Sequence, residues 1–182
     1  SGVATKTINT ISEYTNKLEN SAYKSSFLMR PVFEAARSAS RKIVFSEGED
    51  ERVLRASFSM IEETGDSPIL IGRPDVVMSR IEKYGLPLKI NKDFELVNPE
   101  SDPRFREYWE TYHKIMERRG VTPALAKAIM RTNSTAIAAI MVFRKEADSM
   151  ICGTFGQYLW HLKYIKEVLE NNKLNAIGAL SP

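Results

Sequence analysis

The chain has 182 residues, of which 43% are hydrophobic and 27% are charged, and its 26 basic and 23 acidic residues leave a net charge of +3. This composition excludes a disordered chain and allows one domain with a core of its own. The longest apolar stretch, Thr135 to Phe143, is far short of the roughly 20 residues that span a bilayer, which excludes a membrane-spanning protein.

The order of the charges and the use of cysteine exclude further classes. Basic and acidic residues alternate, as in RFREYWE and KYIKEVLE, which is typical of solvated helix faces and not of a stripe that binds nucleic acid. The single cysteine, Cys152, cannot form an internal disulfide, and no Cys or His pair has the spacing of a zinc site. The N-terminus, SGVATKTINT, lacks the apolar segment of a signal peptide. We therefore expect a cytoplasmic chain that binds neither membranes nor nucleic acid.

The first part of the chain predicts a lead-in segment. Residues 1–26 are polar, and their apolar residues recur at intervals of three and four, which predicts an amphipathic helix within a linker. A short helix over 27–36 follows, with Pro31 in its first turn, where a proline is tolerated. The sequence thus places a portion of a larger domain at 27–182.

From Arg41 onward, predicted strands and helices alternate. Short apolar runs predict the strands, and caps such as Thr122 before Pro123, together with Gly65, Gly85 and Gly120, delimit the helices. The predicted strands are 42–45, 68–72, 87–90, 94–98, 149–152 and 176–180. The predicted helices lie within 46–65, 74–85, 104–119, 123–130, 135–143 and 157–170.

This alternation predicts parallel strands joined by right-handed crossovers, and therefore a three-layer α/β/α fold with a mainly parallel sheet. The last predicted strand, 176–180, has no partner further along the chain, so we expect the natural polypeptide to continue. A sheet of this kind collects ligands beyond the carboxyl ends of its strands.

Three turns lie at those expected carboxyl ends, namely 46–48, 72–74 and 153–156. None has the GxGxxG or GxxxxGK[ST] spacing of a nucleotide-binding loop. The acidic residues that follow the first turn argue against a phosphate cradle there, because they would repel the anion. Arg73 could contact a phosphate at the mouth, although an arginine beside a turn more often faces solvent.

Cys152 lacks the surroundings of a nucleophile. A reactive thiol needs a neighbouring base or cation, whereas His161 lies further along the chain and His113 is remote. We therefore expect a buried, inert cysteine. The aromatic face of the following helix is typical of a core or a subunit interface, and its members are Tyr158, Trp160 and Tyr164. On these residues alone, the chain is a ligand-binding α/β half-domain.

A succession of longer phrases extends this interpretation. RKIVFSEGEDERVLRAS, ILIGRPDVV, VNPESDPRFREYWETYHKIMERRGVTPALAKAIM and AIMVFRKEADSMICGTFG follow one another in this order. Together they resemble the amino-terminal half of a phosphate acetyltransferase domain, which implies a phosphate acetyltransferase or isocitrate dehydrogenase-like fold, truncated. More narrowly, SGVAT, NPESDPRFREYW and MICGTFGQY resemble the version fused behind the catalytic part of large bacterial NADP-dependent malic enzymes.

The chain departs from the acetyltransferase pattern after the strand at 149–152. The family has a small, polar segment with Ser-Gly-Ala, a His and an Arg-Pro, and the serine position here is Cys152, the histidine position Gly156 and the arginine position Lys163. Arginine binds oxyanions through two parallel hydrogen bonds, whereas lysine offers a point charge. A further family arginine falls near Met116, although Arg118 stands close by.

Bulky rings replace small hydroxyl side chains in the same segment. Phe155, Tyr158 and Trp160 stand where the resemblance implies the lining of a phosphate pocket. We therefore expect that the acetyl transfer machinery is lost. The remaining catalytic groups of the family, a serine and an aspartate, belong to the half that this chain lacks, so we predict no catalytic and no metal-binding residue in this segment.

The resemblance implies a regulatory and oligomerisation domain that senses acetyl-CoA. The expected effector site consists of Gly153, Thr154, Lys163, Arg118 and Arg73. The implied partners are further copies of the chain, as a homo-oligomer, and a malic enzyme catalytic domain in cis. That missing domain is expected to hold NADP and a divalent metal, Mg or Mn, and no cofactor is expected in this segment. Two alternatives stay open, namely an active phosphate acetyltransferase and a pure assembly module.

Overall fold

The computed structural model describes residues 29–170, and the chain divides into two compact units, Ser1–Ala39 and Ser40–Pro182. The described part of the first unit is helical over 29–39, where the sequence predicted a helix over 27–36. The predicted lead-in helix at 1–26, the boundary at residue 27 and the strand at 176–180 lie outside the described residues.

The second unit contains a parallel sheet with the strand order β3-β2-β1-β4. Its strands are β1 (Ile43–Phe45), β2 (Ile69–Ile71), β3 (Glu95–Val97) and β4 (Ser149–Ile151). In register, Val44 of β1 lies between Ile69 of β2 and Met150 of β4, and Leu70 pairs with Leu96 of β3. All three pairings are parallel, as predicted.

Helices connect the strands. β1 is followed by α2 (Glu51–Thr64), and β2 is followed by α3 (Pro74–Tyr84). The connection from β3 to β4 contains α4 (Phe105–Met116), a 3-10 turn (Glu117–Arg119), α5 (Pro123–Thr132) and α6 (Ser134–Phe143). After β4 comes α7 (Tyr158–Leu169). The helix ends have the expected chemistry: the Asp50 carboxylate accepts from the Arg52 N–H at 2.8 Å at the start of α2, and the Thr122 hydroxyl accepts from the Leu125 N–H at 3.3 Å at the start of α5. Gly85 ends α3 with a φ of +63°, a conformation that favours glycine.

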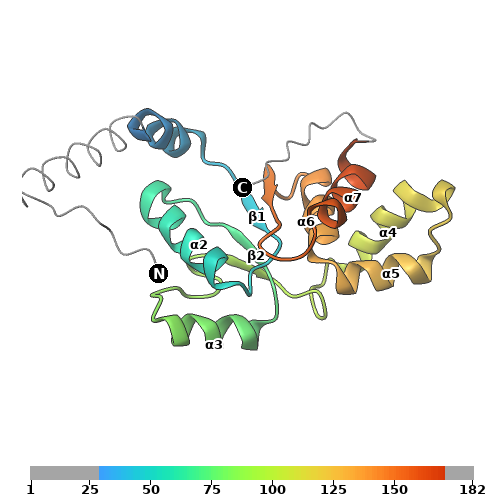
Figure 1. The fold of residues 1–182 in the computed structure, drawn as a ribbon, viewed down its shortest axis with the longest axis horizontal. Helices are drawn as coiled ribbons and strands as arrows, with labels where there is room; N and C mark the ends of the chain where they lie inside the picture. The colour runs from blue at the N-terminus through green and yellow to red at the C-terminus, as the bar shows by residue number, and fades with distance from the viewer. Residues whose placement is uncertain (1–28, 171–182) are drawn as a thin grey trace, which may run out of the picture. The chain divides into compact units, whose positions relative to one another are not determined.

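A hydrophobic cluster lies on each face of the sheet. Along β2 the side chains alternate, so Ile69 and Ile71 pack with α4, α5, α6 and α7, while Leu70 packs with α2 and α3. Figure 1 shows α2 and α3 on one side of the strands and the later helices on the other. Burial on both faces explains why β2 is apolar throughout. The predicted three-layer α/β/α fold is confirmed.

The strand predicted at 87–90 is wrong. Only an isolated bridge joins Ile90 to Phe94, and the chain between them turns tightly, with Asn91 at a φ of +60°. The Asp93 carboxylate closes this turn by accepting from the Lys89 N–H at 2.8 Å. A turn this short cannot return the chain to start a parallel neighbour, which needs a crossover of a dozen residues or more. The second candidate, 94–98, forms β3.

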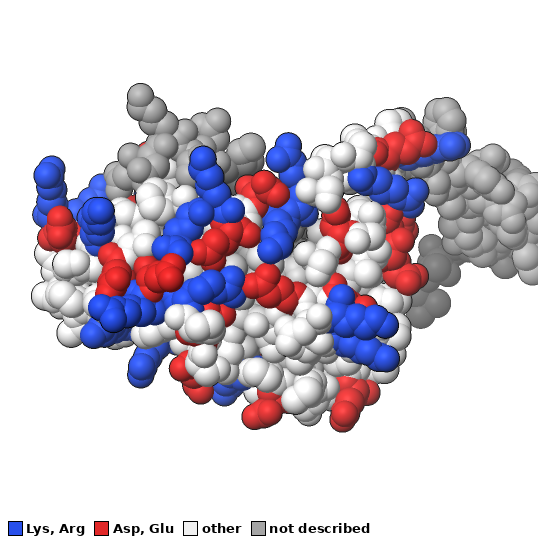
Figure 2. Space-filling model, turned by 180° about the vertical axis from the view of Figure 1, so that it is seen from behind, with Lys and Arg blue, Asp and Glu red and all other residues white. Residues whose placement is uncertain are grey.

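The surface carries charges of both signs. On the face seen in Figure 2, Lys and Arg side chains alternate with Asp and Glu side chains and gather into no single patch. Helix pairs account for part of this mixture, including Arg55 with Glu51 at 2.9 Å and Arg106 with Glu110 at 2.7 Å. Within residues 29–170, no helix combines the length and the apolar character needed to pass through a bilayer.

Candidate ligand cavity at the carboxyl ends of the strands

A cavity of about 570 Å³ lies at the carboxyl ends of β1, β2 and β3. Its walls come from the turns that follow these strands, the junction of α5 with α6 and the turn after β4. The lining residues are Ser46, Glu47, Glu49, Asp50, Ile71, Gly72, Arg73, Arg80, Pro99, Glu100, Arg131, Thr132, Ser134 and Phe155. This is the position at which a parallel sheet of this kind binds ligands.

Arginines neutralise the carboxylates at the start of α2. The Glu49 carboxylate accepts from the Arg73 N–H and Nε at 2.9 Å and from Nη2 at 3.0 Å, and these hydrogen bonds lower the pKa of Glu49 despite its partial burial. Arg52 binds Asp50 in the same two-pronged way at 3.0 Å and lowers the pKa of that carboxyl. The repulsion of anions that the sequence predicted here is therefore compensated by fixed cations.

Arg131 supplies the opposite wall. It belongs to the last turn of α5, and its guanidinium lies over the Phe105 ring, 5.1 Å from the ring centre. Within the described part of the chain Arg131 forms no ion pair, unlike Arg73, which is engaged by Glu49. Ser134 lies beside it at the first turn of α6. The cavity thus contains a guanidinium whose hydrogen-bonding edge is not used by a carboxylate.

The turn at 153–156 brings one aromatic ring to the cavity. Phe155 is 62% exposed and lines the cavity, whereas Tyr158 and Trp160 are not among the lining residues. Of the three rings expected at the mouth of the cavity, only Phe155 lines it. The Thr154 hydroxyl is buried without a hydrogen-bond partner in the described structure.

The structure separates the residues predicted to bind the effector. Arg73 lines the cavity, and Gly153 and Thr154 belong to the turn that carries Phe155. Lys163 lies on α7 with its side chain 62% exposed and its ammonium 4.0 Å from Glu167, and it is not among the lining residues. Arg118, in the 3-10 turn after α4, does not line the cavity either.

Sequence reasoning missed Arg131, Arg80 and Glu100. Arg131 lies in the last turn of a helix and not after a strand, so a search restricted to strand ends could not find it. A usable signal was the junction itself, because Arg131 precedes the first turn of α6, and helix starts attract anions.

Cys152 is half-buried, whereas the sequence predicted a buried cysteine. Burial raises its pKa to about 11, and the nearby Glu47 carboxylate adds to the increase. Both effects oppose formation of the thiolate. Among the described residues, no group of three or more His, Cys, Asp or Glu side chains could hold a metal ion.

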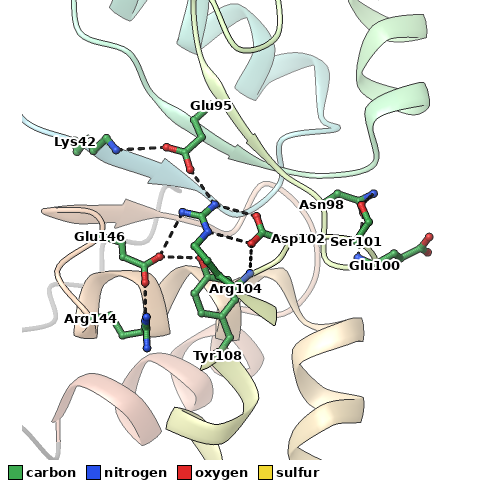
Figure 3. Close-up of polar contacts among 10 residues, drawn as sticks. All are labelled: Lys42, Glu95, Asn98, Glu100, Ser101, Asp102, Arg104, Tyr108, Arg144 and Glu146. Carbon is green, nitrogen blue, oxygen red and sulfur yellow. Dashed lines mark hydrogen bonds and ion pairs between the residues drawn. The ribbon is translucent and has the colours of Figure 1, made fainter. Parts of the chain in front are cut away.

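A second polar cluster lies at the opposite ends of the strands from the cavity and joins the layers (Figure 3). Arg104 binds Asp102 and Glu95 at 2.9 Å and lies 3.6 Å from Glu146, which also accepts from the Tyr108 hydroxyl at 2.8 Å. Glu95 begins β3 and Glu146 precedes β4, so this cluster lies at the amino ends of the strands. Its side chains are engaged with one another, which indicates a structural role.

Comparison with known proteins agrees with this architecture. The sequence model described as "Phosphate acetyl/butaryl transferase" matches residues 27–179. The chain belongs to this family. Two solved members of similar fold are the EutD phosphotransacetylase from Staphylococcus aureus, at 23% identity, and a phosphotransacetylase from Streptococcus pyogenes, at 24% identity. Each has a TM-score of 0.66 and covers 78% of this chain, which covers 43% of theirs.

The relatives of higher identity are malic enzymes. The chain is 50% identical over 168 residues to the NADP-dependent malic enzyme of Salmonella typhimurium and 46% identical over 170 residues to the NAD-dependent malic enzyme of Rhizobium meliloti. These matches take in 92% and 93% of the chain but 22% of each relative. The phosphate acetyltransferase of Synechocystis is 29% identical over 141 residues, which are 78% of the chain and 20% of that protein. The chain thus spans about a fifth of these relatives.

Proposed function

We propose that this chain is the metabolite-sensing part of a malic enzyme and binds acetyl-CoA without transferring the acetyl group. The rest of that enzyme, in the same polypeptide, would oxidise and decarboxylate malate to pyruvate and CO2 in the cytoplasm. The observation that carries the proposal is the cavity at the strand ends, where Glu49 and Asp50 are paired with arginines while Arg131 keeps its hydrogen-bonding edge for a ligand.

The cavity suits an anionic ligand that also has a flat or apolar part. A guanidinium binds phosphate or carboxylate through two parallel hydrogen bonds, and Arg131 is oriented by its contact with Phe105. Phe155 offers an exposed ring in the same lining. Acetyl-CoA has both features, with phosphates at one end and an acyl thioester at the other.

The surroundings of Cys152 support binding without acyl transfer. Cys152 stands at the position of the family's serine, and its pKa of about 11 keeps it protonated at neutral pH. His161 is the only histidine near it, and both ring nitrogens of His161 already have partners, Thr135 at 2.8 Å and the Phe155 carbonyl at 2.7 Å. Binding without chemistry is sufficient for a sensor.

Sensing requires that acetyl-CoA bind two conformations of the enzyme with different affinity. Couplings of this kind amount to about 1–3 kcal/mol, or about 5- to 150-fold in affinity. We propose that the domain also assembles the enzyme into a homo-oligomer. NADP and a divalent cation, Mg or Mn, would be held by the part of the enzyme outside this chain. NADP is chosen because the relatives from Salmonella typhimurium and Escherichia coli are NADP-dependent malic enzymes, whereas one from Rhizobium meliloti is NAD-dependent.

Three measurements on the full-length protein test the proposal. Titration calorimetry with acetyl-CoA should show saturable binding, and acetyl-CoA should inhibit malate oxidation. Incubation with acetyl-CoA and phosphate should yield no acetyl phosphate. Formation of acetyl phosphate at ordinary enzymatic rates would identify an active phosphate acetyltransferase instead, and the absence of any binding would identify an assembly module.

A further inference from the structure

A buried acid and a buried histidine lie beneath the turn at 153–156. Glu47, in the turn after β1, is 5% exposed, and His161, on α7, is 4% exposed. The His161 Nδ1 lies 3.7 Å from the nearer Glu47 oxygen. Cys152 is also close to Glu47, which raises its pKa. Thr135 faces the ring from α6.

Each of three consecutive turn residues is held by a side chain from a different element. The Gly153 N–H donates to the two Glu47 oxygens at 3.2 and 3.1 Å. The Thr154 carbonyl accepts from Arg52 of α2. The Phe155 carbonyl accepts from His161 Nε2 at 2.7 Å. The backbone of the turn is therefore fixed, while the Phe155 ring points out and lines the cavity.

The bond to Phe155 determines the protonation of the histidine ring. A carbonyl can only accept, so Nε2 carries a proton. With the proton on Nε2, Nδ1 can accept from the Thr135 hydroxyl, so both ring nitrogens have a partner.

The next residue, Gly156, leaves room for the imidazole of His161. Gly156 has a φ of +90°, and a Cβ there would lie 3.2 Å from His161 Nε2. The glycine at this position thus permits the imidazole to approach the turn.

We infer that His161 is a positioning residue for the cavity, which sets ligand affinity by fixing the turn that presents Phe155, although His161 itself does not line the cavity. The inference rests on the proposed function in one respect, because acetyl-CoA is the ligand used to measure affinity. The position of the turn can be measured without any ligand.

Two amide variants of the full-length protein separate positioning from general stability. In His161→Gln the side-chain N–H₂ can reach the place of Nε2 and donate to the Phe155 carbonyl. In His161→Asn the shorter amide reaches only the place of Nδ1, near Thr135. Both variants are uncharged and polar, so they differ chiefly in the bond that is proposed to matter.

The first readout is amide hydrogen exchange in a peptide covering 153–157, measured by mass spectrometry without ligand. The second is acetyl-CoA affinity by calorimetry. His161→Asn should accelerate exchange in the turn and weaken binding about tenfold, which is the usual cost of leaving a buried acceptor unpaired. His161→Gln should stay within about threefold of wild type in both readouts, because it keeps a neutral hydrogen bond to the Phe155 carbonyl.

A third variant, Phe155→Ala, keeps the carbonyl but removes the ring. It should weaken acetyl-CoA binding while leaving exchange at its neighbours unchanged. Equal exchange in the Gln and Asn variants would overturn the inference, as would unchanged binding in Phe155→Ala when wild type binds. If wild type itself binds no acetyl-CoA, the proposed function fails, and the exchange comparison still decides whether His161 positions the turn.

Discussion

Alkylation of Cys152 tests the claim that this site has lost its chemistry. The thiol has a pKa of about 11 against an ordinary value of 9.0. At pH 8 the thiolate fraction is then about a hundredfold smaller than that of an unperturbed cysteine, because each unit of pKa is a factor of ten. A thiolate of higher pKa is intrinsically more nucleophilic, with a Brønsted slope of about 0.4–0.5, which returns a factor of about eight. The net expectation is an alkylation rate about tenfold below that of an unperturbed thiol.

The assay is reaction with iodoacetamide at pH 8, followed by mass spectrometry of the peptide that contains Cys152. The same protein unfolded in urea is the matched control, because its thiol has ordinary surroundings. The folded protein should react at least about tenfold more slowly, and its rate should keep rising until the pH passes about 11. A folded-state rate equal to or above that in urea would contradict the reasoning, since it would require a depressed pKa and an activated nucleophile.

Three further predictions concern binding and stability. Arg131→Ala in the full-length protein should weaken acetyl-CoA binding about tenfold or more in calorimetry, whereas the matched surface variant Lys163→Ala should change it less; the reverse order would move the anion site to α7. Gly48→Ala should lower the free energy of unfolding by about 1–3 kcal/mol in urea titration, because the added Cβ would lie 2.8 Å from the backbone of β2; unchanged stability would contradict that packing. Arg104→Ala should cost about 2–3 kcal/mol, since it leaves partly buried carboxylates unpaired. Burial opposes ionisation of Asp102, but its hydrogen bonds to Arg104 prevail and lower its pKa. Its contribution to the free energy of unfolding is therefore present at neutral pH and is lost as the pH falls below about 4. Wild type should show this loss of stability, and Arg104→Ala should not.

The fold was predictable because local and global signals agree. Apolar runs such as that of β2 are buried on both faces, and glycines such as Gly65 and Gly85 end helices in left-handed conformations. The error at 87–90 arose because an apolar tetrapeptide satisfies a strand pattern without regard to the connection that follows it. Only the length of the turn to Phe94 shows that both segments cannot join one parallel sheet.

The site was predictable in position and less so in composition. Strand ends located the cavity and Arg73, because the topology of a parallel sheet fixes that edge. The pairing of Glu49 with Arg73 joins residues from two different turns, so the expected repulsion could not be weighed from sequence. Arg131 reaches the cavity through the packing of α5 and α6, and the hydrogen bonds of His161 depend on how α7 returns to the sheet. Contacts of this kind depend on tertiary structure.

Titration of the full-length protein with acetyl-CoA, with malate oxidation followed at each concentration, tests the central claim most directly. The rate should fall along a saturable curve, and phosphate added at the end should release no CoA. A rate independent of acetyl-CoA, or CoA released in step with acetyl phosphate, would contradict that claim.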